Sequence, residues 1–324
     1  MKMRAVVFEK YGNPDVLHLK DIEKPTPKGN EVLIKVKAVS INEWDHSILT
    51  AKLLANRIMF GLFKPTKMKV LGCDISGIVE SIGKDVKKFK VGDEVFGDLS
   101  GDSWGGMAEY VCGPESSFLL KSSNMSFEEA SAIPQAGLLA LQSFDQHGKV
   151  GPGSKVLVNG AGGGAGTFAI QIAKDLGAEV TGVDSGLKWN VMKDLGADHV
   201  IDYTKEDFTR NGRIYDHIIE VTGDRKLADY RRALAENGLC SLVGGSMWLI
   251  LKASLFGSKG NKRIALMMYE QNKGLERLVE LYDSGKVKPF IDRCFSLEDA
   301  AEAFRFYGSG NFKGKIVVTI DDAP

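Results

Sequence analysis

The chain has 324 residues, of which 44% are hydrophobic and 26% are charged, a composition typical of a globular protein with two domains. Lysine plus arginine and aspartate plus glutamate both total 42, so the formal charge is zero, which argues against a nucleic-acid partner. The four cysteines form no CxxC pair, which favours a reducing compartment. No signal peptide or membrane span is predicted. We therefore expect a cytoplasmic protein without a membrane partner.

The first third of the chain consists of short β-rich runs separated by Gly, Pro, Asn and Asp, which predicts an all-β module. These runs lie at residues 3–12, 31–41, 76–83, 92–98 and 107–113. The apolar run at residues 50–69 lies among them, and we expect it to form a mobile loop of the substrate pocket.

The pattern changes after residue 123. Ser126 and Glu129 form a predicted capping box ahead of a long apolar helical stretch. From Lys155 onward, apolar strands alternate with amphipathic helices, which predicts a doubly wound parallel sheet and thus an α/β fold. Gly177 and Gly196 are expected to end two of these helices in the left-handed conformation. The predicted elements that follow include helices at 227–238, about 271–284 and 296–307, and strands at 289–295 and 314–320.

A glycine-rich turn, "NGAGGGAG" at residues 159–166, lies between a predicted strand and a predicted helix. Its A-x-G-x-x-G spacing falls on Ala161, Gly163 and Gly166, with Gly164 and Ala165 between them. Gly163 would let the backbone approach a pyrophosphate, and Gly166 would let the helix pack closely on the strand. This context predicts a dinucleotide site, with a glycine turn that binds no ligand as the alternative.

The residues that follow the next strand bear on the choice of cofactor. Asp184 is placed to accept the ribose hydroxyls of NAD, whereas Ser185 and Lys188 would favour the 2′-phosphate of NADP. A solvated surface charge is the alternative for Lys188. We expect NADPH, with NAD possible because of Asp184, and we include Tyr203 among the cofactor-binding candidates.

Four motifs in this order resemble the medium-chain dehydrogenase/reductase superfamily, in its zinc-independent branch of quinone oxidoreductases and enone reductases. They are "GAGGGAG", "LGADHVIDYTKEDF" at 195–208, "VGG" at 243–245 and "GKIVV" at 314–318. The resemblance implies a GroES-like catalytic domain at 1–123 and 289–324 and a Rossmann-like NAD(P)-binding domain at 124–288. By analogy with the family, it also implies a homodimer. It also implies that Val243, Gly244 and Gly245 approach the nicotinamide carboxamide, with an ordinary turn as the alternative.

The resemblance also bears on metal binding. Zinc-containing relatives use a cysteine, a histidine and a second cysteine or acid as ligands, and the matching positions here are Asn42, Cys73 and Gln135. Cys73 alone cannot hold zinc, which needs three protein ligands and an open fourth position. We therefore expect no metal site.

Without a metal, the developing negative charge on a hydride acceptor must be spread by conjugation, as in an enone or a quinone. The resemblance implies that Asn42 lies beside the nicotinamide ribose, and Asp45 completes the family's N-x-x-D spacing. A turn residue is the alternative for Asn42, and a structural cap is favoured for Asp45. Trp44 and Trp104 are candidates for lining the substrate pocket, with exposed or core aromatics as the favoured alternative.

The sequence thus predicts an NAD(P)H-dependent oxidoreductase that transfers a hydride to a small quinone or α,β-unsaturated carbonyl. Two alternatives stay open at this point: a low-turnover nucleotide-binding protein similar to the crystallin relatives, and a zinc-type alcohol dehydrogenase relative.

Overall fold

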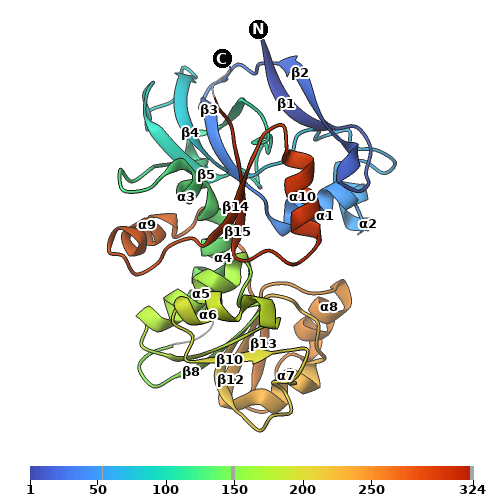
Figure 1. Cartoon of the computed structure of the whole chain (residues 1–324), viewed down its shortest axis with the longest axis vertical. Helices are drawn as coiled ribbons and strands as arrows, with labels where there is room; N and C mark the ends of the chain where they lie inside the picture. Colours follow the sequence, from blue (N-terminus) through green and yellow to red (C-terminus); the bar gives the residue numbers. More distant parts are fainter. Residues whose placement is uncertain (53, 147–149, 322–324) are drawn as a thin grey trace. The chain divides into compact units, whose positions relative to one another are not determined.

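The computed structural model describes residues 1–52, 54–146 and 150–321. The chain divides into two compact units, Met1–Gln135 with Ile291–Pro324, and Ala136–Phe290. Figure 1 shows the first unit in the blue and red ends of the colour scale, because both ends of the chain contribute to it. The division differs from the predicted one at residues 124–135 and 289–290. Residues 124–135 join the first unit because helix α3 (Phe127–Ala132) contacts its strands.

The first unit contains a seven-stranded sheet and a two-stranded sheet. The larger sheet has the order β14-β15-β3-β4-β5-β7, with β6 paired to β3, and β14 and β15 are its parallel pair. Its strands are β3 (Glu31–Ser40), β4 (Asp74–Ile82), β5 (Glu94–Asp98), β6 (Tyr110–Pro114), β7 (Leu119–Leu120), β14 (Ile291–Ser296) and β15 (Lys315–Thr319). The smaller sheet pairs β1 (Lys2–Phe8) with β2 (Leu17–Glu23).

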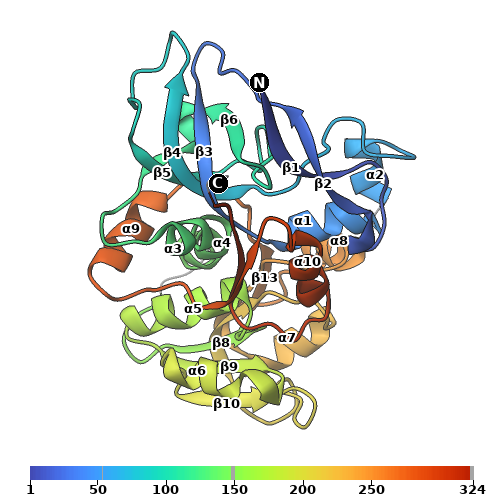
Figure 2. The ribbon, with the colours of Figure 1, turned by 45° about the horizontal axis from the view of Figure 1, so that its top comes forward.

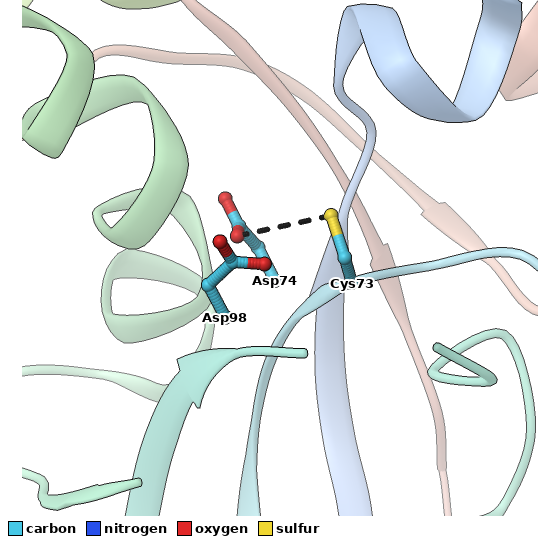
Figure 3. Close-up of side chains that lie close together, drawn as sticks. All are labelled: Cys73, Asp74 and Asp98. Atoms are coloured by element: carbon cyan, nitrogen blue, oxygen red, sulfur yellow. Dashed lines mark hydrogen bonds between the residues drawn. The ribbon is translucent and has the colours of Figure 1, made fainter. Parts of the chain in front are cut away.

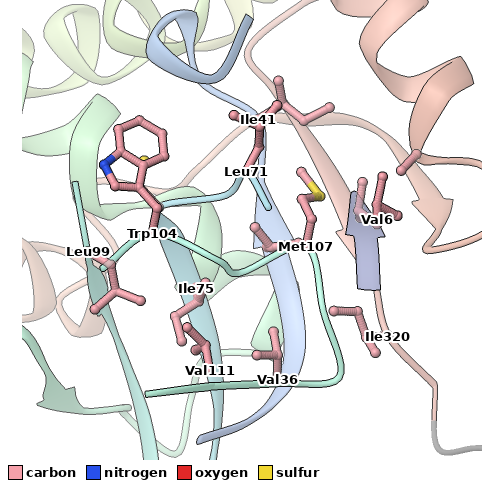
Figure 4. Close-up of a cluster of buried hydrophobic side chains, with 14 of the residues drawn as sticks. Val6, Val36, Ile41, Leu71, Ile75, Leu99, Trp104, Met107, Val111 and Ile320 are labelled. Carbon is pink, nitrogen blue, oxygen red and sulfur yellow. The ribbon is translucent and has the colours of Figure 1, made fainter. Parts of the chain in front are cut away.

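The core of the first unit is formed where alternate side chains of strands face inward. Val32, Ile34 and Val36 of β3 are all buried, as the two-residue period of a strand requires. Figure 4 shows Leu71, Trp104 and other loop residues closing the same cluster. The strands packed around this core carry the polar site described below.

The first third of the chain is not all β as predicted, because it also carries helices α1 (Glu43–Thr50) and α2 (Leu54–Phe60). The first unit also contains α10 (Ala300–Gly308), which confirms the helix predicted at 296–307. The expectation of a loop at residues 50–69 is wrong for the residues of α2. This helix is held by side-chain hydrogen bonds: Asn56 Nδ2 donates to the Ser47 carbonyl at 2.9 Å and Arg57 Nε donates to the Ala51 carbonyl at 3.1 Å.

The second unit has a six-stranded sheet in which every pair is parallel, with the order β10-β9-β8-β11-β12-β13. Its strands are β8 (Lys155–Asn159), β9 (Glu179–Asp184), β10 (His199–Asp202), β11 (Tyr215–Glu220), β12 (Leu234–Leu242) and β13 (Arg263–Leu266). The order reverses between β8 and β11, which is the topological switch point of a doubly wound fold. The predicted fold class is confirmed.

Helices α5 (Gly164–Asp175) and α6 (Trp189–Asp194) lie beside this sheet (Figure 2), with α5 against β8 and β9 and α6 against β10. Helix α7 (Leu227–Ala233) contacts β12 and β13, α8 (Met247–Phe256) contacts β13, and α9 (Leu275–Asp283) follows. The left-handed glycines are confirmed, with φ of 83° at Gly177 and 103° at Gly196.

Two predicted helices have different limits in the structure. The stretch after Ser126 forms two helices, because the second, α4 (Pro134–Asp145), begins at a proline, which has no N–H to continue the first. The capping box is confirmed, since Glu129 N donates to Ser126 Oγ at 3.1 Å. The helix predicted at 227–238 ends at Ala233, because buried Leu234 already pairs with Tyr215 in the sheet.

Candidate active site

The glycine turn joins β8 to α5, and its glycines have different steric roles. A Cβ on Gly166 would lie 2.1 Å from the Gly160 carbonyl oxygen and 2.6 Å from Ala161 Cα, so the helix packs too closely on the turn for any other residue. A Cβ on Gly163 would meet only the Gly160 oxygen, at 3.5 Å. Open space therefore lies at the N-terminus of α5, where helix amides lack partners within the helix. These residues fit the pyrophosphate of a dinucleotide.

Asp184, the last residue of β9, is bonded to this turn. Its Oδ2 accepts a hydrogen bond from Gly162 N at 3.0 Å, and its Oδ1 accepts one from Ser185 N at 2.8 Å. Lys188 Nζ lies 3.4 Å from the same Oδ1, and both side chains are about 10% exposed or less. The alternative that Lys188 is a solvated surface charge is therefore wrong: it is a buried ion-pair partner of Asp184.

Glu220, the last residue of β11, is a site residue that the sequence reasoning missed. It is fully buried and accepts hydrogen bonds from Asn159 Nδ2, at 3.0 and 2.9 Å, and from Gly223 N at 2.8 Å. Burial raises the pKa of the Glu220 carboxyl above its ordinary value. The available signal was an acid at the end of an apolar strand, "YDHIIE". The hydrogen bonds between Glu220 and Asn159 therefore link the ends of β11 and β8 at the switch point.

The other cofactor-binding candidates also follow carboxyl ends of parallel strands. Tyr203, after β10, is 52% exposed, and its N–H donates to the Asp184 carbonyl at 3.2 Å. Val243, Gly244 and Gly245 follow β12, and a Cβ on Gly223 would lie 2.2 Å from Gly245 Cα. The structure therefore places these candidates at the edge of the sheet where open α/β folds bind ligands.

Asn42 and Asp45, the two catalytic candidates, are both buried at the start of α1 in the first unit. Asp45 Oδ2 accepts from Asn42 N at 2.9 Å, and Oδ1 accepts from Gly72 N at 2.8 Å. Burial raises the pKa of Asp45 to about 7 against the lowering effect of these two bonds. Because both carboxylate oxygens of Asp45 accept hydrogen bonds from backbone N–H groups, the geometry favours the structural role for this residue.

The Asn42 side chain contacts a buried lysine that the sequence reasoning missed. Lys315 Nζ on β15 donates to Asn42 Oδ1 at 2.5 Å and to the Ile41 carbonyl at 3.3 Å. Its side chain is 3% exposed, and burial lowers its pKa. The signal was a lysine inside the apolar strand "GKIVV". Because Lys315 donates a hydrogen bond to the amide oxygen of Asn42, it fixes the orientation of this amide. The amide nitrogen, Asn42 Nδ2, then lies 3.6 Å from Cys73 Sγ.

Three further buried groups, Cys73, Asp74 and Asp98, lie close together (Figure 3), and Cys73 contacts Asn42. Asp74 and Asp98 are directly opposite one another on antiparallel strands β4 and β5, an arrangement that is unfavourable for two like charges. Lys315 Nζ lies 3.9 Å from Asp74 Oδ2 and compensates part of this charge. Burial, followed by the charge of Asp98, raises the pKa of Asp74 well above its ordinary value. Burial likewise raises the pKa of the Cys73 thiol.

These three residues bear on the expectation of no metal site, because the Cys73 sulfur and one carboxylate oxygen each of Asp74 and Asp98 lie within 4.8 Å of one another. The sequence reasoning considered only Cys73. The carboxylates, however, already have donors: Gln135 N donates to Asp74 Oδ2 at 3.0 Å, and Ser100 N and Oγ donate to Asp98 at 2.7 and 2.8 Å.

The side chains at the other positions where zinc relatives carry ligands are amides here. Asn42 Nδ2 and Gln135 Nε2 both face Cys73 Sγ, at 3.6 and 3.9 Å, and present N–H groups in place of ligand atoms. A zinc ion would also have to bind near the Lys315 ammonium, which repels a dication. The donor set therefore does not fit a catalytic zinc site.

A cavity of about 550 Å³ also belongs to the first unit and is lined by residues of α1, α2 and the loop at 100–104. Trp44 and Trp104 line it with stacked rings, whose centroids are 6.4 Å apart and whose planes differ by 13°. Met59 and Phe60 of α2 add apolar surface. The cavity has the size and the apolar, aromatic lining of a small-molecule site.

Comparisons with known proteins agree with this architecture. Residues 28–123 match the alcohol dehydrogenase GroES-like domain, and residues 195–318 match the family described as zinc-binding dehydrogenase. A chloroplastic quinone oxidoreductase of Triphysaria versicolor is 34% identical over 98% of both chains. The 2-methylene-furan-3-one reductase of Solanum lycopersicum is 32% identical, covering 98% of this chain and 79% of that one.

Among solved structures, the quinone oxidoreductase of Coxiella burnetii matches with a TM-score of 0.88 and 31% identity, covering 99% of this chain and 100% of that chain. The chain therefore belongs to the medium-chain dehydrogenase/reductase superfamily of oxidoreductases, in its branch of quinone oxidoreductases and enone reductases.

Proposed function

We propose that this protein is an NAD(P)H-dependent oxidoreductase that reduces a quinone or an α,β-unsaturated carbonyl without a zinc ion. The observation that carries the proposal is the buried centre of the first unit, in which the Asn42 amide stands at a zinc-ligand position of the relatives and accepts a hydrogen bond from the buried Lys315 ammonium. The names of the relatives support it, since one is a quinone oxidoreductase and another an NADPH-dependent alkenal/one oxidoreductase.

The glycine turn and the strand ends of the second unit are the proposed cofactor site. A bound nicotinamide cofactor supplies the hydride. Gly163 leaves room for the pyrophosphate beside the N-terminus of α5, and Gly166 keeps that helix against the turn. The backbone at Val243, Gly244 and Gly245 is the proposed contact for the carboxamide, and Tyr203 is proposed to contact the cofactor.

We propose NADPH as the preferred cofactor. Because both oxygens of Asp184 accept backbone N–H groups and Lys188 pairs with one of them, the carboxylate is compensated and repels a phosphate less than a bare aspartate would. Lys188, in its ion pair with Asp184, and Ser185 are the proposed cation and hydroxyl that contact the 2′-phosphate.

The first unit is proposed to stabilise the acceptor. Hydride addition to a conjugated acceptor leaves negative charge spread over an enolate or phenolate, which hydrogen-bond donors and a cation can stabilise in a buried site. Lys315 carries the cation and orients the Asn42 amide, and Asp45 holds the loop that carries Asn42 by its two backbone bonds. Asn42 is the proposed catalytic contact, and Lys315 and Asp45 are positioning residues.

A substrate panel tests this proposal. Purified protein is assayed for loss of reduced-cofactor absorbance with quinones and enones, and for the reverse signal with simple alcohols and oxidised cofactor. We expect turnover with the conjugated acceptors, and a loss of at least tenfold in kcat/KM for Asn42→Ala but not for Asn13→Ala, a matched variant at an exposed asparagine. Turnover of alcohols alone would favour an alcohol dehydrogenase. Cofactor binding without any turnover would favour the nucleotide-binding alternative.

A further inference from the structure

The cavity of the first unit gathers three aromatic rings and two thioethers in its wall. Trp44, Trp104 and Phe60 contribute the rings, and Met59 and Met68 contribute flexible side chains with a polarizable sulfur. All the residues that line the cavity belong to the first unit. The chemistry of this wall therefore follows from one unit alone.

Trp104 is the fixed member of this group. It is 4% exposed, and its indole nitrogen, Nε1, donates to the Ser100 carbonyl at 2.9 Å. Its backbone φ of 54° lies in the left-handed region, which bulky residues rarely adopt. Strain of this kind persists where the surrounding structure holds it, and it is concentrated at functional sites. Because its N–H is already bonded, Trp104 offers the cavity the carbon surface of its ring.

Trp44 is the open member of the group. It lies on α1 with Ser47 and Ile48, at spacings of three and four residues that share one face of a helix, and all three line the cavity. The ring of Trp44 stacks on that of Trp104, with 6.4 Å between the centroids and 13° between the planes. Trp44 is nevertheless 49% exposed. Part of its indole is therefore open to a further flat ring that would extend the stack.

Polar side chains of the wall are bonded to the protein itself. Asn56 Nδ2 donates to the hydroxyl oxygen and to the carbonyl of Ser47, both at 2.9 Å. Asp102 Oδ2 accepts from Ser117 Oγ at 2.5 Å. Lys67 is a cation of the lining and is exposed to solvent. The wall is therefore suited to recognise a ligand by its shape and apolar surface.

We propose that this cavity binds a fused-ring acceptor, of the naphthoquinone class, by stacking its flat face on Trp44, and that Trp44 sets this preference. The statement that the bound ring accepts the hydride rests on the proposed function. Aromatic rings in offset-stacked geometry attract one another beyond the area that they bury. An enone without an aromatic ring gains the contribution of buried area alone.

The position of Trp44 in the chain relates the cavity to the proposed catalytic contact. Asn42 is the N-cap of α1 and Trp44 follows it by two residues, so their Cα atoms are at most about 7 Å apart. A ring stacked on Trp44 therefore lies close to the residue that is proposed to contact the acceptor.

Helix α2 forms the adaptable side of the wall. All seven residues of α2 are at least partly exposed, and Met59, which lines the cavity, is 59% exposed. The ring of Phe60 meets that of Trp104 edge-on, with 6.5 Å between the centroids and 77° between the planes. None of the helices formed by the described residues, α2 included, has the length and apolar character that crossing a bilayer requires. A partly open methionine beside fixed rings leaves room for a second fused ring.

The expected size of the effect follows from the stacking. An aromatic pair contributes about two- to tenfold in affinity beyond the area that it buries. Trp44→Leu keeps an apolar side chain at the site but removes the flat face. It should therefore weaken the binding of a fused-ring quinone about two- to tenfold more than that of a non-aromatic enone. Trp44→Phe keeps a ring and should retain the preference.

Calorimetric titration of the full chain measures this preference without turnover, in the presence of oxidised cofactor, which has no hydride to give. The probes are a dimethylnaphthoquinone with both quinoid positions methylated, duroquinone, and isophorone, a non-aromatic enone. We expect the naphthoquinone to bind more tightly than duroquinone, because its second ring extends the stacked face. Phe63→Leu is the matched control, since Phe63 is 86% exposed and lies outside the lining of the cavity. Urea unfolding checks that each variant is folded.

A selective loss of naphthoquinone binding in Trp44→Leu, with Trp44→Phe and Phe63→Leu unchanged, supports the proposal. Equal weakening of all three probes in Trp44→Leu overturns it, as does unchanged binding, an equal loss in Phe63→Leu, or no binding of the naphthoquinone to the unmodified chain. Loss of binding in Lys67→Gln while Trp44→Leu binds normally would also overturn it and assign the cavity to a ligand recognised by charge.

The same titration separates this inference from the proposed function. Selective binding of the naphthoquinone by a protein that does not reduce it would leave the assignment of the cavity intact and remove the proposed reaction. Reduction of quinones by a protein whose binding does not depend on Trp44 would do the reverse.

Discussion

Replacing Lys315 with methionine should destabilise the protein strongly, because it removes the cation beside the buried carboxylates of Asp74 and Asp98, called here the acidic centre. The ammonium contacts Asn42 Oδ1 at 2.5 Å, the Ile41 carbonyl at 3.3 Å and Asp74 Oδ2 at 3.9 Å, and its side chain is 3% exposed. Removing one partner of such a pair leaves a buried charge uncompensated and costs about 3–5 kcal/mol. The double variant Lys315→Met, Asp74→Asn should recover at least half of this loss, because it removes the orphaned charge as well.

The loss of folding stability in Lys315→Met should depend on pH. Burial and Asp98 raise the pKa of Asp74, and Lys315 lowers it, so the pKa of Asp74 rises further in the variant. A carboxyl whose folded-state pKa is raised binds more protons in the folded than in the unfolded protein, so stability falls as pH increases. The defect of Lys315→Met should therefore grow with rising pH.

Urea unfolding followed by tryptophan fluorescence measures this loss, because Trp44 and Trp104 belong to the first unit. Lys205→Met is the matched control, since its side chain is 78% exposed and its ion pair with Asp202 is worth at most about 1 kcal/mol. A loss below about 1 kcal/mol for Lys315→Met, or no recovery in the double variant, would refute the argument that Lys315 compensates the acidic centre.

The remaining predictions concern the capping acid, the glycine turn and the cofactor preference. Burial raises the pKa of Asp45 from its ordinary 3.8 to about 7. The free energy of unfolding should therefore fall by about 4 kcal/mol in total as the pH rises from about 4 to about 7. In urea titrations, the Asp45→Asn variant should lack this dependence on pH. Gly163→Val should fold but fail to bind cofactor in a fluorescence titration. Gly166→Val should in addition unfold at a lower urea concentration, because its Cβ would lie 2.1 Å from a carbonyl oxygen. Normal cofactor binding by Gly163→Val would show that the turn does not bind the phosphate groups. Lys188→Ala should lower kcat/KM more than fivefold with NADPH and little with NADH. Asp184→Ala should lower kcat/KM with both cofactors, because the Gly162 amide loses its hydrogen-bond partner. An equal loss with both cofactors for Lys188→Ala would contradict the preference for NADPH.

The fold class and the glycine turn could be predicted because their signals are local. The alternation of strand and helix, the spacing of Gly163 and Gly166 and the acid at Asp184 all lie within a short stretch of sequence. The structure adds what the stretch could not reveal, namely that Asp184 and Lys188 bind one another and the turn. Side-chain pairing of this kind depends on how the chain turns after β9.

The acidic centre of the first unit could not be predicted, because its members come from separate strands. Asp74, Asp98 and Lys315 lie on β4, β5 and β15, and only the register of the folded sheet brings them together. Each residue alone resembles an ordinary polar residue at a strand end. Helix α2 was missed because its apolar residues face outward, which gives no pattern of a buried face.

The most direct test of the central claim is the turnover of a quinone by protein whose metal content has been measured in the same sample. We predict that freshly purified protein with far less than one zinc per chain oxidises NADPH with a quinone at full rate, and that a strong chelator leaves this rate unchanged. One zinc per chain, whose removal abolishes turnover, would contradict the account and assign Cys73, Asp74 and Asp98 to a metal centre.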